Sequence, residues 1–159
     1  MSEKALDTLV SELARSLRIE VPAKRRDGSY KLRFDNRHNV TLSSVPGGDI
    51  LIAGRLSRLP NDQTTRNVIV RECMQFALGR AGSSKACLSL DKQTNALFLH
   101  RLVAPDTAAM AFEENVSDFV NDLFWWKSNV GSQKADTSAP HASATTTPMQ
   151  FLHPNMLVR

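Results

Sequence analysis

Residues 30–56, YKLRFDNRHNVTLSSVPGGDILIAGRL, set the architecture that we predict for this chain. Apolar residues recur there at every second position with polar residues between them: Tyr30, Leu32, Phe34, Val40 and Leu42. Such alternation is typical of strands that bury one face. Turn-forming residues at 36–39 and 46–49 separate these runs from a third apolar run over 50–56. The pattern predicts three antiparallel strands connected as a meander.

Helical patterns flank this meander on both sides. Residues 3–18 carry leucines and a valine at the spacing of an amphipathic helix: Leu6, Leu9, Val10, Leu13 and Leu17. After Pro60, Asn61 or Asp62 can cap a second helix that continues to Gly79 and Gly82. Its apolar residues cover a wide arc, which predicts that this helix is buried on more than one side.

The remaining part of the folded region is predicted to be a hairpin and a closing helix. Leu88 and Leu90 mark one short strand, Leu97 and Leu99 another, and a polar turn joins them at 91–95. Residues 106–127 then repeat apolar residues at helical spacing. We therefore predict one α+β domain over residues 1–130. The expected order is a helix, three strands, a helix, two or three strands and a helix, with helices packed on an antiparallel sheet.

The composition changes beyond Val130. Thirteen of the seventeen residues from Ser132 to Pro148 are Ser, Thr, Ala or Pro, which predicts a flexible tether. Apolar residues return at 149–159, MQFLHPNMLVR. Residues 131–159 are thus predicted to be a tail that is either disordered or ends in a segment that binds a groove on its own or a neighbouring subunit.

Catalytic and metal-binding patterns are missing from the sequence. It has no Gly-x-Ser-x-Gly elbow and no glycine-rich phosphate loop, and its four histidines are scattered. Cys73 and Cys87 are too few for a disulfide framework, so we expect two reduced thiols. We predict no enzyme activity, no cofactor and no metal. No run of residues is long and apolar enough for membrane insertion, and the start of the chain has no signal sequence, which predicts a cytoplasmic protein.

Charge is unevenly distributed along the chain, whose net charge is +4. Residues 15–37 hold eight basic residues against three acidic ones, whereas residues 106–122 hold five acidic residues and no basic one. The basic residues that could gather on one edge are Lys24, Arg25, Arg26, Lys31 and Arg33. They fit a docking site for an acidic partner or a solvated face. Nucleic-acid binding and a small enzyme of unrecognised type are the alternative functions.

The whole pattern resembles the class I type III secretion chaperones of the Tir chaperone family over residues 3–130. The similarity lies in the leucine-rich first helix and in residues 32–35 (LRFD), 50–60 (ILIAGRLSRLP), 88–91 (LSLD) and 112–121 (FEENVSDFVN). It implies a homodimer of α/β sandwiches in the bacterial cytoplasm. Such a dimer binds the N-terminal segment of one or more secreted effectors, keeps it extended and delivers it to the export apparatus. The uneven charge, rather than the resemblance, suggests an export component such as the secretion ATPase as a candidate partner of the basic residues.

The resemblance also implies where partners bind. The effector would contact Leu6, Leu9, Val10, Leu13, Leu32, Phe34, Val40, Leu42, Ile50 and Ile52. The second subunit would contact Met74, Leu78, Leu88, Leu90, Leu97 and Leu99.

Overall fold

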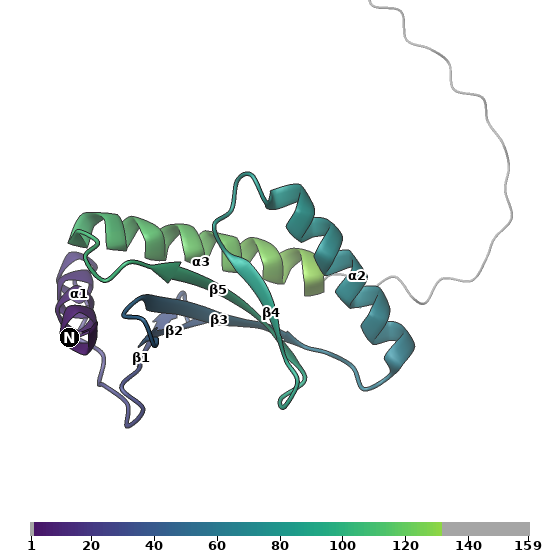
Figure 1. The fold of residues 1–159 in the computed structure, drawn as a ribbon, viewed down its shortest axis with the longest axis horizontal. Coiled ribbons are helices and arrows are strands. Elements are labelled where there is room, and N and C mark those ends of the chain that lie inside the picture. The colour runs from purple at the N-terminus through teal and green to yellow at the C-terminus, as the bar shows by residue number, and fades with distance from the viewer. Residues whose placement is uncertain (1, 132–159) are drawn as a thin grey trace, which may run out of the picture.

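A computed structural model describes residues 2–131 as an α+β fold with three helices and five strands (Figure 1). The helices are α1 (Ser2–Ser16), α2 (Gln63–Arg80) and α3 (Ala109–Gly131). The strands are β1 (Tyr30–Phe34), β2 (His38–Ser44), β3 (Ile50–Arg58), β4 (Cys87–Asp91) and β5 (Ala96–Val103). The predicted order of elements is confirmed, with two strands between α2 and α3. The predicted tail lies outside the described residues.

All five strands form one antiparallel sheet in the order β1-β2-β3-β5-β4. The meander of β1 to β3 is confirmed, and the β4–β5 hairpin joins it through β5, which pairs with β3. The register of that pairing shifts between Arg55 and Ser57, where the ladder contains an irregularity. β1 and β4 are therefore the two free edges of the sheet.

Helices α1 and α3 cover one face of the sheet, and the side chains between these layers form the hydrophobic core (Figure 1). The largest fully buried side chains come from both layers: Leu6, Val10, Val40, Leu42, Ile50, Ile52, Leu99, Phe112, Val116, Phe119 and Leu123. Residues of the opposite parity, such as Lys31, Arg33 and Leu102, are exposed. No helix of residues 2–131 covers the second face of the sheet.

Helix α3 lies close to the sheet because Gly54 of β3 has no side chain. A Cβ atom at Gly54 would lie 2.8 Å from Cδ2 of Leu123. The helix begins at Ala109, three residues after the start of the predicted helical stretch 106–127. Thr107 forms a turn in which its hydroxyl donates to the carbonyl of Ala104 at 2.7 Å.

Helix α2 stands at the end of the sheet, beside the C-terminal end of α3 (Figure 1). The predicted cap is confirmed at Asp62, whose carboxylate accepts a hydrogen bond from the backbone N–H of Thr65 at 2.7 Å. The prediction of burial on more than one side is wrong, because Cys73 is the buried residue of this helix and much of its apolar arc faces solvent.

Polar and aromatic contacts hold α2 against α3. Arg80 donates to the carboxylate of Asp122 at 2.6 Å, and its guanidinium lies 4.1 Å from the ring centroid of Trp125. Phe76 meets Trp125 in an edge-to-face arrangement with centroids 5.8 Å apart. Trp126, in contrast, is buried, so the two adjacent tryptophans occupy different environments as expected from their positions on a helix.

Candidate functional site

An apolar groove of about 220 Å³ lies where α1, β1 and α3 meet. Leu13, Leu17, Phe34, Val116 and Val120 provide its apolar surface. Polar side chains of α3 line the rest: Glu113, Ser117 and Asn121. Leu13 and Val116 are buried, whereas Leu17 keeps 38% of its surface exposed. The groove is therefore a hydrophobic hollow that residues 2–131 leave open.

A hydrogen bond between α1 and α3 lies beside this groove. The hydroxyl of Ser16 donates to Oε2 of Glu113 at 2.7 Å. Beyond it the chain continues with Ile19 and Val21, two apolar residues that are exposed. Ile19 and Val21 were not predicted to bind a partner, since they follow the end of the helical stripe and match no periodic pattern.

Nine of the ten residues expected to contact an effector lie in the hydrophobic core of the chain. The nine are Leu6, Leu9, Val10, Leu13, Leu32, Val40, Leu42, Ile50 and Ile52. Their side chains pack between the helices and the sheet, so they offer an approaching polypeptide little or no surface. Phe34 and Leu13 line the groove. Effector binding by α1 and β1 to β3 stays a prediction, and the atoms available for it belong mainly to neighbouring residues.

The residues expected at a dimer interface also include both core residues and exposed residues. Leu97 and Leu99 are core residues, and Leu88 and Leu90 are partly buried on the edge strand β4. Two residues of α2 are free for a contact: Met74 is 64% exposed and Leu78 is 80% exposed. Val68 on the same helix is also exposed, although it was not among the residues predicted for the interface. Helix α2 thus presents an apolar surface that the described part of the chain does not cover.

The basic segment before β1 is tied to α1 through Asp7. Nζ of Lys24 lies 2.9 Å from Oδ1 of Asp7, and the hydroxyl of Tyr30 donates to the same oxygen at 2.8 Å. The hydrogen bond from Lys24, followed by that from Tyr30, lowers the pKa of Asp7. Arg25 and Arg26 are exposed beside this cluster.

Lys31 and Arg33 are exposed on the open face of the sheet rather than on the side covered by helices. Together with Arg25 and Arg26, they leave the basic segment accessible to a partner. Docking of an acidic partner there stays a prediction.

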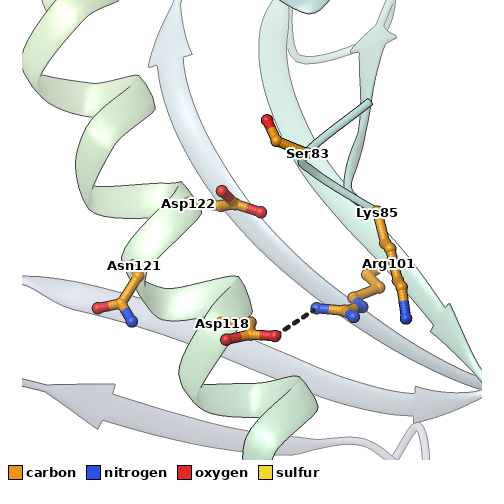
Figure 2. A pocket seen from close by; sticks show the side chains of 6 residues that line it. All are labelled: Ser83, Lys85, Arg101, Asp118, Asn121 and Asp122. Carbon is orange, nitrogen blue, oxygen red and sulfur yellow. Dashed lines mark ion pairs between the residues drawn. The ribbon is translucent and has the colours of Figure 1, made fainter. Parts of the chain in front are cut away.

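A second hollow of about 220 Å³ is polar and lies between α3 and the connection from α2 to β4 (Figure 2). Arg101 and Lys85 face Asp118 across it, and the Arg101 guanidinium is 3.8 Å from the Asp118 carboxylate. Arg101 is buried although it is charged. The neighbouring Asp122 accepts hydrogen bonds from Arg80 and from the hydroxyl of Ser84. This hollow is an ion-pair network beneath α3, and its six lining residues include neither a cysteine nor a histidine.

Within residues 2–131, no group of three His, Cys, Asp or Glu side chains is placed to hold a metal ion. Burial raises the pKa of the Cys73 thiol, with Glu72 adding to the shift, so this cysteine is a protonated core residue at neutral pH. Cys87 is a free thiol on the surface. No helix in the described part of the chain combines the length and apolar character needed to cross a bilayer.

Comparison with solved structures identifies the class of fold. A chain of the HopA1–SchA chaperone–effector complex matches with a TM-score of 0.62 and 17% identity, covering 80% of this chain and 97% of that one. A chain of the ExsC–ExsE complex matches with a TM-score of 0.63 and 16% identity, covering 79% and 92%. The Yersinia pestis type III secretion chaperone SycH, solved with a stable fragment of YscM2, gives 0.53 and 17%, covering 76% and 98%. The fold is that of the type III secretion chaperones.

The sequence itself matches a family model over residues 8–127. The chain belongs to the Tir chaperone protein (CesT) family. This family is one of chaperones rather than of enzymes, and the resemblance inferred from the sequence pattern is confirmed. A comparison with curated proteins finds no match.

Proposed function

We propose that this chain is a bacterial type III secretion chaperone that binds the N-terminal segment of one or more effectors. It keeps that segment extended and delivers it to the export apparatus from the cytoplasm, and it catalyses no reaction. The observation that carries this proposal is the open apolar groove between α1, β1 and α3 on a fold of this family. Two of the similar structures are complexes of a chaperone with another protein. HopA1–SchA is a chaperone–effector complex, and the type III secretion chaperone SycH is in complex with a stable fragment of YscM2.

The groove suits an extended peptide rather than a folded domain. Leu17 and Phe34 can each cover an apolar side chain of the leader, and burial of one Leu, Ile or Phe contributes about 1.5–3 kcal/mol before the ordering cost. Ile19 and Val21, which follow Leu17 in the sequence, are exposed apolar residues that the leader could also contact. Several such shallow contacts retain a leader without enclosing it in a stable globule, as passage through a narrow secretion channel requires.

The free edge of the sheet at β1 offers a second type of contact. Its outward backbone groups can pair with an added strand, and such main-chain hydrogen bonds tolerate different sequences. Since β1 ends at Phe34 in the groove, an added strand would bring alternate side chains close to the apolar hollow. A chaperone with this arrangement can accept more than one effector.

A homodimer formed through α2 and the edge strand β4 completes the proposal. Met74 and Leu78 on α2 are apolar and largely exposed, and Leu88 and Leu90 of β4 are covered only in part. Burial of these side chains against a second copy removes an apolar surface from water. Dimerisation also joins two weak effector sites into one stronger one.

The experiment begins by capturing the partner from a lysate of the bacterium that encodes this chain. Once the partner is identified, its purified N-terminal segment is digested with protease in the presence of the chaperone. We expect protection of that segment by the wild-type chain and loss of protection with Leu17→Asp. Leu102→Asp is the matched control, because Leu102 is an exposed leucine on the open face of the sheet. Unprotected leader, or equal loss with both variants, would contradict the proposal.

The two alternative functions have no support among the comparisons. A nucleic-acid-binding module would bind with a steep dependence on salt, which a filter-binding series measures directly. An enzyme would require convergent titratable groups in a pocket. In the polar hollow, Arg101 instead pairs with Asp118, and Asp122 pairs with the neighbouring Arg80.

A further inference from the structure

The groove between α1, β1 and α3 has room for a large apolar side chain. Its volume of about 220 Å³ exceeds that of an apolar cavity of roughly 150 Å³, which is enough to hold benzene. Leu17, Phe34 and Val120 are only partly buried along it. One aromatic ring with an adjacent aliphatic side chain would cover them.

A segment with this chemistry is present in the same chain. Residues 149–159, MQFLHPNMLVR, contain the pair Phe151 and Leu152 directly after a stretch poor in apolar residues. The segment has basic Arg159 and no acidic residue. The α3 side of the groove carries Glu113, with Glu114 next to it in sequence. The charges of the two surfaces are therefore complementary as well.

The length of the intervening chain matches the distance to be spanned. Helix α3 lines the groove with Val116 and Val120 and ends at Gly131, so the groove lies about 16–22 Å back along this helix. The residues between Gly131 and Phe151 are 132–150. A coil of that length has an average end-to-end distance of about 24 Å, and full extension would give about 60 Å. The segment reaches the groove without stretching.

We propose that residues 149–159 dock into the α1–β1–α3 groove of their own chain, with Phe151 and Leu152 as the apolar anchors. A short tether produces a local concentration on the order of 1 mM, so a contact with a dissociation constant of that size is occupied about half of the time. Weak intrinsic binding is sufficient for this role. The proposal concerns two parts of one chain and stands whether or not an effector uses the same groove.

The test follows methyl NMR signals of Leu13, Leu17, Val116 and Val120 in the full chain. We expect the double variant Phe151→Asp and Leu152→Asp to shift these groove signals and to leave core methyls such as Ile52 unchanged. The matched control places the same two charges in the intervening chain as Thr145→Asp and Thr146→Asp, and its groove signals should equal those of the wild type. A synthetic peptide of residues 149–159, added to the double variant, should restore the wild-type positions.

Groove signals that are identical in the wild type and the double variant would overturn the proposal. So would an equal shift in the control, because it would show a general effect of charge. Labelled double variant is also mixed with unlabelled wild-type chain. If the wild-type signals return in that mixture, the segment docks on a second copy and the intramolecular proposal is wrong.

Discussion

Gly54 determines how closely α3 approaches the sheet, since a methyl group there would overlap the buried side chain of Leu123. We expect Gly54→Ala to destabilise the fold by about 1–3 kcal/mol, the usual cost of overpacking a core. Gly79 of α2 is the matched control because a Cβ atom there meets nothing within 4 Å. Gly79→Ala should stabilise by about 0.5–1 kcal/mol through helix propensity. Urea unfolding at one fixed protein concentration measures both changes, and shifts in the same direction would contradict this account.

His38 makes stability depend on pH. Its ring is buried and lies edge-to-face against Phe124, with centroids 5.7 Å apart. Its Nδ1 has no hydrogen-bond partner among the described residues. Burial lowers the pKa of His38 below 6.5, and Lys127 and Arg37 lower it further while Asp35 acts in the opposite direction. The charged form is therefore disfavoured in the folded state.

The unfolded chain consequently takes up a proton on this histidine at higher pH than the folded chain does. We expect the free energy of unfolding to fall as the pH drops below about 6.5 and to show no loss from this group above it. His38→Gln should flatten this dependence between pH 6.5 and pH 5 in a series of urea titrations. His100→Gln removes a half-buried histidine of the same sheet and serves as control. An unchanged slope in His38→Gln would exclude His38 as the source.

For single residues of the strands, alternation in the sequence predicted which side is apolar but not what covers that side. Leu32, Val40 and Ile52 were expected to face an effector, and they face α1 and α3 instead. Periodicity identifies the face of a strand that is buried. It does not show whether a helix of the same chain or a peptide of a partner buries that face. The groove residues Val116 and Val120 could not be selected from the sequence, because that requires knowing that α3 lies next to β1.

Helix α2 is the element on which the proposed homodimer most depends. We expect Met74→Asp combined with Leu78→Asp to shift the chain from dimer to monomer in sedimentation velocity, because each change places a charge in the proposed contact. Met110→Asp is the control, since Met110 is 75% exposed on α3. The proposed interface would be wrong if the double variant sedimented like the wild type, or if the wild type were already monomeric.

The order of helices and strands could be predicted because each element carries its own local pattern and its own turn residues. The lateral order of the strands could not, since the pairing of β5 with β3 joins segments separated by all of α2 and β4. The exposure of α2 was also missed. Cys73 and Phe76 of its wide apolar arc do pack against the core of the chain. The width of the arc alone does not show which of its residues stay exposed.

For the molecule as a whole, the separation of charge suggests a second docking surface. We expect Arg25→Glu with Arg26→Glu to weaken binding of an acidic partner, an effector or an export component such as its ATPase, by about tenfold at low salt. Arg58→Glu with Lys92→Glu is the control, because it reverses two exposed charges elsewhere on the surface. Pull-down at two salt concentrations measures the effect. Unaltered complex formation by the first pair would exclude a role for this basic segment.

The first helix packs against the last one, through the hydrogen bond from Ser16 to Glu113 and through the shared hydrophobic core. During translation, α1 leaves the ribosome while most of its packing partners have yet to be synthesised. It cannot reach its native position until α3 has emerged, so the domain completes folding only near the end of its own synthesis. A nascent chain interrupted before α3 would expose the apolar stripe of α1 and become a substrate for the cell's proteases.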